Sequence, residues 1–248
     1  MFYIFLFISG LAVGSFLNVV IDRLTYNESF FGRSYCDFCR TQLKSYDLFP
    51  LFSFFMYKGI SRCCGKKLSW YYPIVEISTA LLFVLLWTFV PVADIYRFLY
   101  LAIGACLIAI FFSDLKYQII PDELLIVYTL FAIPFFLMNP LDHLIGGIVI
   151  FGIFQFIHSV TKGKAMGYGD VKFALVIGLF QGLRLGALSM YFAFLLGGIM
   201  GIVLVIFHKK KPKSMIAFGP FLVIGVVLTI FFEKTLLQII GQYFYPLR

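Results

Sequence analysis

The chain has 248 residues, of which 62% are hydrophobic and 13% are charged, and its mean hydropathy is +0.98. A chain of this composition cannot expose most of itself to water, which excludes a soluble protein. The formal net charge of +8 lies mostly in a few loops, where membrane topology and anionic lipid explain it without direct nucleic-acid binding.

Apolar runs predict about eight transmembrane helices, because a helix needs ~20 residues to cross ~30 Å of hydrocarbon. The run 171–183 is the weakest, since ~13 residues at ~1.5 Å each cover only ~20 Å. We expect it to be tilted in a thinned region or partly re-entrant. The first run has no basic segment before it, which favours a retained helix over a cleaved signal peptide. The predicted spans are residues 2–21, 73–91, 95–113, 122–138, 142–160, 171–183, 186–207 and 215–237.

The distribution of Lys and Arg predicts the orientation, because positively charged short loops stay in the cytoplasm. With the N-terminus outside, sixteen of the twenty Lys and Arg fall in inner segments. The basic run 208–213 is then an anchor for the seventh helix that faces anionic lipid. We therefore expect an all-α, multi-pass protein of a bacterial cell membrane.

Residues 22–72 depart from the membrane pattern. They are polar and contain eight basic residues, four acidic residues and four of the five cysteines. So small a unit rarely buries enough apolar surface to fold alone, and a metal ion or docking onto the helices would support it. We expect a first helix over 1–21, a cytoplasmic Cys-rich domain over 22–72 and a seven-helix membrane domain over 73–248.

The cysteines of this domain indicate a metal site. Cys36 and Cys39 are separated by two residues, and Cys63 and Cys64 follow after a gap of 23 residues. Thiolates at this spacing suit tetrahedral zinc, and a reducing cytoplasm argues against disulfides. The second half is irregular, because Ser61 stands where a regular motif would have a cysteine. A four-Cys zinc site, a three-Cys site with another ligand and a metal-free loop remain the alternatives.

Two aspartates lie at the predicted ends of membrane helices. Asp114 ends the third helix and Asp170 begins the sixth, so the predicted topology places both at the cytoplasmic side. Ionisable groups are expensive at such positions, and two carboxyls are the minimum for acid–base hydrolysis. The alternatives are a solvated helix terminus for Asp114 and an N-cap for Asp170. Gly167 and Gly169 form a turn that also allows close backbone approach and could hold an extended peptide.

In combination, the motifs along nearly the whole chain resemble the type IV prepilin peptidases, of the Gly-x-Gly-Asp aspartyl protease class. The matching segments are Gly14-Ser15-Phe16-Leu17-Asn18, Arg33-Ser34, Asp47 with Pro50-Leu51, Tyr72-Pro73-Ile74-Val75-Glu76, Asp114 with Ile120-Pro121-Asp122, and Gly167-Tyr168-Gly169-Asp170.

The resemblance implies a membrane aspartic endopeptidase that cleaves the basic leader of prepilins or pseudopilins after a Gly, at the cytoplasmic face. It implies Asp114 and Asp170 as the catalytic pair, and S-adenosylmethionine as the methyl donor for the new N-terminus. The Cys-rich domain corresponds to the family's zinc-type, methyltransferase-associated domain, and 73–248 corresponds to the peptidase domain. Pilus assembly, type II secretion or DNA uptake is the expected role, with prepilins and the lipid bilayer as partners.

Two other classes of protein are alternatives. A proton- or cation-coupled transporter also carries intramembrane carboxylates, but it is expected to show an internal repeat and charges near the midplane. Neither is evident in this sequence. An assembly scaffold that binds pilus components without cleaving them would keep its function when Asp114 or Asp170 is replaced by Asn.

Overall fold

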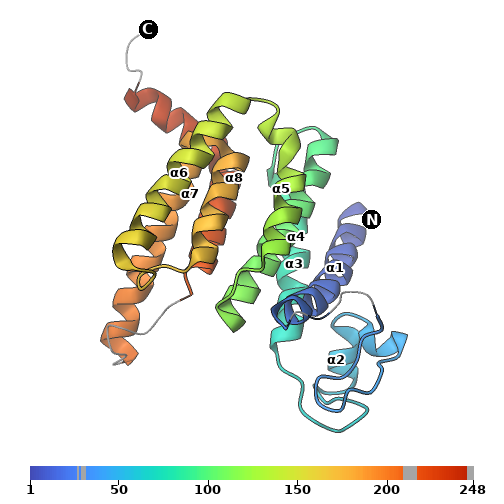
Figure 1. Cartoon of the computed structure of the whole chain (residues 1–248). Helices are drawn as coiled ribbons and strands as arrows, with labels where there is room; N and C mark the ends of the chain where they lie inside the picture. The colour runs from blue at the N-terminus through green and yellow to red at the C-terminus, as the bar shows by residue number, and fades with distance from the viewer. Residues whose placement is uncertain (27, 29–31, 209–216, 245–248) are drawn as a thin grey trace. The chain divides into compact units, whose positions relative to one another are not determined.

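The computed structural model describes residues 1–26, 28, 32–208 and 217–244. Its described part contains helices and two isolated β-bridges, which confirms the predicted all-α class. The chain forms two compact units, Met1–Ser113 and Asp114–Arg248, coloured from blue to green and from green to red (Figure 1). The basic run at 209–213, predicted to anchor a helix, lies outside the described residues.

The first unit is built around the pair α1 (Phe2–Thr25) and α3 (Tyr71–Phe89), followed by α4 (Asp94–Tyr117). Two glycines of α1 let the backbones of the pair touch: a Cβ on Gly10 would lie 2.6 Å from the Ala80 Cα, and a Cβ on Gly14 would lie 2.7 Å from the Glu76 Cα. The chain between α1 and α3 contains the 3-10 turn η1 (Ser45–Leu48) and the short helix α2 (Phe52–Met56). This segment is the predicted Cys-rich domain.

The second unit contains α5 (Asp122–Phe136), α6 (Pro140–Thr161), α7 (Tyr168–His208) and α8 (Gly219–Phe244), together with the last residues of α4. The helix α7 packs against the other three. It is interrupted at Gly182, whose φ of 73° lies in the region that favours glycine. The interruption corresponds to the boundary predicted between the spans 171–183 and 186–207.

Close contacts and buried hydrogen bonds hold the second unit together. A Cβ on Gly178 of α7 would lie 2.6 Å from the carbonyl carbon and oxygen of Gly146 in α6. In the core, Gln181 Nε2 donates to Thr229 Oγ1 at 2.7 Å, and Ser189 Oγ lies 2.7 Å from the same atom. These bonds join the two halves of α7 to α8, as polar side chains often do between membrane helices.

Six helices of the described chain are long and apolar enough to cross a membrane: α1, α3, α4, α6, α7 and α8. The sequence predicted about eight spans, and each predicted segment overlaps a helix. The difference arises because α5 has only 15 residues and because α7 combines two predicted spans. The protein is therefore a multi-pass membrane protein.

Candidate functional site

Asp114 lies in the last turns of α4 and is only 5% exposed. Its Oδ2 accepts a hydrogen bond from the backbone N–H of Gly219 at 2.9 Å. Gly219 is the first residue of α8, and the N-terminus of a helix favours a negative charge. The start of α8 therefore offsets the unfavourable position of this carboxyl at the C-terminal end of α4.

Asp170 is the third residue of α7 and is 7% exposed. Its Oδ2 accepts a hydrogen bond from the backbone N–H of Gly167 at 3.1 Å, just before the helix begins. When the side chain of the third helical residue accepts the backbone N–H of the residue just before the helix, it forms one half of a capping box. Asp170 therefore fixes the start of α7 from inside the helix, and is not the N-cap considered from the sequence.

The structure places Asp114 and Asp170 in the same compact unit and close enough to interact electrostatically. Each carboxyl uses one oxygen to accept a backbone N–H. Because a carboxyl has two oxygens and about four lone-pair sites, each keeps acceptor capacity for water or a substrate group. The arrangement provides the paired carboxyls that acid–base hydrolysis requires.

The predicted turn at Gly167 and Gly169 packs closely on its surroundings. A Cβ on Gly167 would lie 3.3 Å from the Asp170 Oδ2, and one on Gly169 would lie 3.2 Å from the Ile120 Cβ. Lys172 of the same segment pairs with Asp122 at 2.7 Å, at the first residue of α5. Gly169 thus allows the turn to lie against the chain that precedes α5, and Gly167 leaves space for the Asp170 carboxyl.

Sequence reasoning missed Gly219, which is 105 residues after its partner Asp114. The dipeptide Gly219-Pro220 before an apolar run is typical of a helix start. That signal locates the beginning of α8, but it does not show which side chain the free N–H groups contact.

The cysteines lie on two turns with the same backbone hydrogen bonds. In the first turn, Cys36 N–H donates to Thr41 O at 2.9 Å and Arg40 N–H donates to Cys36 O at 2.8 Å. In the second turn, Ser61 N–H donates to Lys66 O and Gly65 N–H donates to Ser61 O, both at 2.8 Å. Each turn is closed by one β-bridge. By this repeat, Ser61 occupies the place of Cys36, and Cys64 occupies the place of Cys39.

The four thiols nevertheless form one cluster, because Cys63 supplies the thiol that is missing at Ser61. The four Sγ atoms lie within 4.8 Å of one another. The Sγ atoms of Cys36 and Cys64 are 3.8 Å apart, and those of Cys39 and Cys63 are 3.1 Å apart. Tetrahedral zinc with bonds of ~2.3 Å requires sulfur atoms about 3.8 Å apart. The residues present therefore fit a four-thiolate metal site.

Ser61 contacts two of these thiols. Its Oγ lies 3.3 Å from the Cys36 Sγ and 3.2 Å from the Cys63 Sγ. Burial opposes ionisation of Cys36, but hydrogen bonds from Ser61 and from the backbone of Cys39 and Phe38 lower the pKa of Cys36 to about 6. The hydroxyl therefore stabilises a thiolate, the form in which cysteine binds metal.

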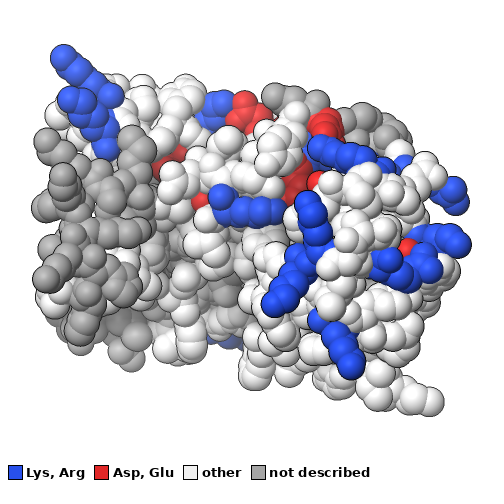
Figure 2. Space-filling view, turned by 90° about the horizontal axis from the view of Figure 1, so that it is seen from below, with Lys and Arg blue, Asp and Glu red and all other residues white. Residues whose placement is uncertain are grey.

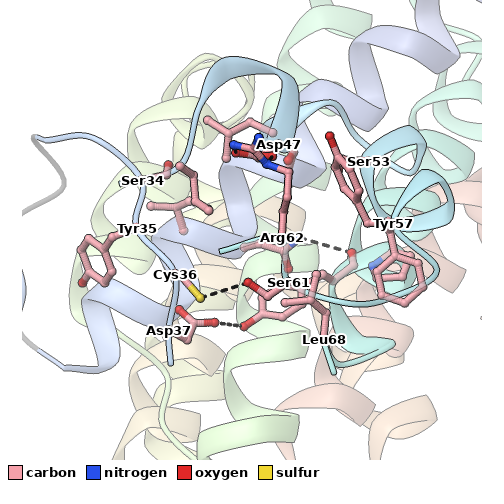
Figure 3. A pocket seen from close by; sticks show the side chains of 18 of the residues that line it. Ser34, Tyr35, Cys36, Asp37, Asp47, Ser53, Tyr57, Ser61, Arg62 and Leu68 are labelled. Carbon is pink, nitrogen blue, oxygen red and sulfur yellow. Dashed lines mark hydrogen bonds and ion pairs between the residues drawn. The ribbon is translucent and has the colours of Figure 1, made fainter. Parts of the chain in front are cut away.

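A cavity of about 190 Å³ lies where the Cys-rich domain meets α1 and α3. Asp37 and Asp47 lie beside it, together with Arg62 and the first thiol of the cluster, that of Cys36 (Figure 3). We call it the loop cavity. It lies entirely within the first unit.

Comparison with known proteins identifies the family. Residues 8–90 match the model described as "Bacterial Peptidase A24 N-terminal domain", and residues 101–206 match the "Type IV leader peptidase family". The chain belongs to this family and is therefore a multi-pass membrane peptidase.

Curated relatives support this assignment over nearly the whole chain. It is 30% identical over 238 residues to the prepilin leader peptidase/N-methyltransferase of Bacillus subtilis (strain 168), which covers 94% of this chain and 95% of the relative. It is 30% identical over 250 residues to the protein of the same description from Pseudomonas aeruginosa, covering 87% and 85%. The Klebsiella pneumoniae relative is 32% identical over 194 residues, covering 72% and 84%. No solved structure matches.

Proposed function

We propose that the protein removes the basic leader of type IV prepilins or pseudopilins, and then methylates the new N-terminus with S-adenosylmethionine as methyl donor. The observation that carries this proposal is the buried pair Asp114 and Asp170, which are held by backbone N–H groups of Gly219 and Gly167. The names of the relatives, which combine peptidase and N-methyltransferase, support both activities.

In the proposed mechanism Asp114 and Asp170 act as one acid–base unit. Two nearby carboxylates do not both ionise cheaply, so one keeps its proton. The ionised carboxylate takes a proton from water as the water oxygen attacks the scissile carbonyl carbon. The protonated carboxyl donates a hydrogen bond to the carbonyl oxygen and stabilises the developing oxyanion. The carbon–nitrogen bond then breaks, and the leaving amine receives a proton.

The substrate must present an extended segment to this pair, because the carbonyl groups of a helix are occupied and shielded. We propose that Gly167 and Gly169 provide room for that segment, because a side chain at Gly167 would crowd the Asp170 carboxyl and the glycines let the backbone of the turn approach a partner closely. Cleavage after a Gly, before an apolar helix, places the scissile bond where the substrate enters the membrane.

The proposed site lies at the cytoplasmic face, with the N-terminus of the enzyme outside. The basic leader of a substrate stays on the same side by the positive-inside rule. Seen from below, Lys and Arg side chains spread over the surface of the protein with Asp and Glu among them (Figure 2). Processed substrates would serve pilus assembly, type II secretion or DNA uptake.

The Cys-rich domain, residues 22–72, would serve the methyltransferase activity, and 73–248 the peptidase. Cys36, Cys39, Cys63 and Cys64 would hold a zinc ion, which would fix the two turns to each other as structural zinc does in small domains. S-adenosylmethionine, when bound, supplies the methyl group.

The experiment that tests this function measures both reactions in one sample. The purified protein in lipid is incubated with a prepilin and tritiated S-adenosylmethionine, and leader loss and label transfer are followed separately. Leader loss alone would refute methylation, and the absence of both would refute the enzyme. Loss of the leader would also distinguish the protein from a scaffold or a transporter.

Asp114→Asn and Asp170→Asn should each reduce cleavage by ~10²–10⁴-fold, the usual contribution of an acid–base group. Asn keeps the shape of Asp and still accepts the N–H of Gly219 or Gly167, but it cannot transfer a proton. Glu123→Gln is the matched control, because Glu123 is an exposed carboxylate of the same unit. Full activity in either Asn variant would exclude that residue from catalysis.

A further inference from the structure

The loop cavity is rich in acidic groups, although the Cys-rich domain that contributes to its lining is basic. Residues 22–72 contain eight basic and four acidic residues, and three of the four acids line the cavity, with Glu76 of α3 as a fourth carboxylate. Only two of the eight basic residues line it. One of them, Arg62, pairs with Asp47 at 3.1 Å. The lining groups are Asp22, Asp37, Asp47 and Glu76 against Arg23 and Arg62.

Asn18 of α1 lines this cavity and has an unused acceptor. The side chain is 6% exposed, and its Nδ2 donates to the Tyr72 carbonyl at 3.2 Å. Its Oδ1 is buried and has no hydrogen-bond partner among the described residues. A buried acceptor without a donor is rare in proteins and requires an explanation. A ligand that donates hydrogen bonds provides one.

Glu76 lines the same cavity and is 7% exposed. Its carboxylate accepts the Leu51 N–H at 2.8 Å and a hydrogen bond from the Ser15 hydroxyl. A carboxylate has about four lone-pair sites, so it can accept further donors. A buried negative charge is stabilised best by a cation that is also a hydrogen-bond donor.

The contact between α1 and α3 places Asn18 and Glu76 together in the lining of the cavity. The close approach at Gly14 places the backbone of α1 against Glu76, and Asn18 follows Gly14 by one helical turn on the same face. Phe54 and Tyr57 of the Cys-rich domain line the cavity as well. They offer aromatic surface to the body of a ligand whose cationic end meets Asn18 and Glu76.

We propose that the loop cavity binds a ligand of methyl transfer through its primary ammonium group, which donates to Asn18 Oδ1 and to the Glu76 carboxylate. This inference rests on the proposed methyltransferase function. Two molecules in that reaction carry such a group: the methyl donor S-adenosylmethionine and the free N-terminus of the cleaved substrate. The chemistry of recognition is the same for both, and direct binding distinguishes them.

The test measures binding to the full-length protein in lipid nanodiscs. One arm uses tritiated S-adenosylmethionine. The other uses a peptide with a free α-amino group followed by apolar residues, beside its N-acetylated twin, which lacks the ammonium group. We expect one of the two ammonium ligands to bind, and the acetylated peptide not to bind. Failure of both ammonium ligands to bind the wild-type protein would overturn the proposal.

Glu76→Gln removes the charge but keeps an oxygen that can accept the Leu51 N–H. We expect it to weaken binding at least ~10-fold, as expected for the loss of a charge-assisted bond. The matched control is Asp94→Asn, which makes the same charge change at a side chain that is 74% exposed in the same unit. It should leave the affinity unchanged.

Val19→Phe tests the cavity itself, because Val19 lines it and a larger side chain there takes up space that a ligand would need, while Asn18 and Glu76 keep their own side chains. We expect a similar loss of binding, with thermal unfolding in the absence of ligand as the check that each variant folds. Wild-type affinity in both variants would overturn the proposed cavity but leave the enzyme's function intact. Absence of methyl transfer by the wild-type protein would instead overturn the proposed function.

Discussion

Gly219 acts on Asp114 through its backbone and through the absence of a side chain. Its N–H donates to the Asp114 Oδ2, and its missing Cβ leaves the space that the carboxyl occupies. A Cβ there would lie 2.7 Å from that oxygen, well inside van der Waals contact. Gly219 is therefore a positioning residue for the proposed catalytic pair.

We predict that Gly219→Ala reduces the rate of leader cleavage by ~10²-fold, because a displacement of about 1 Å can cost that much in a catalytic group. The effect should appear in kcat more than in KM, since Asp114 is proposed to act on the bond and not to hold the substrate. Gly198→Ala is the control, because nothing lies within 4 Å of a Cβ at that position. Equal kcat in the two variants would contradict the positioning role.

Cys63 is expected to replace the missing ligand of the second turn. We predict that the wild-type protein purifies with about one zinc ion per chain, and that Cys63→Ser removes it. The double variant Ser61→Cys with Cys63→Ser should restore the metal, because position 61 repeats the place of Cys36. Metal content by mass spectrometry measures each step. Cys106→Ala is the control, and zinc retained in Cys63→Ser would exclude Cys63 as a ligand.

At the scale of elements, the apolar runs located the helices because lipid burial demands long apolar segments. The 3-10 turn η1 and the short helix α2 were not predicted, since they lie in a short polar segment without clear periodicity. The interruption of α7 coincides with Gly182, and a Cβ there would meet the Asp142 carboxylate. Close contacts of this kind depend on a partner far along the chain, which a local pattern does not reveal.

The candidate site was predictable only where its residues stand out in the local sequence. Asp114 and Asp170 stand out because charged residues are rare at the ends of apolar runs. Their partners Gly219 and Gly167 act through backbone N–H groups, which every residue except proline has. The loop cavity was not predicted, since it depends on the contact between α1 and α3 and on how the Cys-rich domain packs against them.

The contact between α6 and α7 gives a prediction for stability. Gly178→Ala should lower the free energy of unfolding by about 1–3 kcal/mol, the usual cost of overpacking, because its Cβ would lie 2.6 Å from the Gly146 carbonyl. Gly152→Ala in α6 is the matched control, with nothing within 4 Å. Thermal unfolding in detergent measures both. Equal melting temperatures for the two variants would show that α6 and α7 accommodate the added methyl group at position 178 without loss of stability.

At the scale of the whole molecule, the first family match, 8–90, lies within the first compact unit, and the second match, 101–206, lies mostly within the second. The Cys cluster and the loop cavity belong to the first unit, and the carboxyl pair belongs to the second. Each proposed activity therefore has its residues within one unit, and the domain limits at 21 and 72 remain predictions.

The orientation is tested with thiol labelling in a variant without native cysteines. Ser69→Cys lies before α3 and Ala93→Cys lies before α4, and both positions are exposed. With the N-terminus outside, a membrane-impermeant reagent should label position 93 in intact spheroplasts and position 69 only in inverted vesicles. The opposite pattern would reverse the predicted topology.

The repeated turns of the Cys-rich domain have an evolutionary consequence. Cys63 and position 61 both lie beside the same cluster, because Ser61 Oγ is 3.2 Å from the Cys63 Sγ. A chain with cysteine at both positions would have five thiols for four coordination places. Under the proposed zinc site, two single substitutions would therefore exchange one ligand for the other, and the intermediate chain would keep at least four thiols at the cluster.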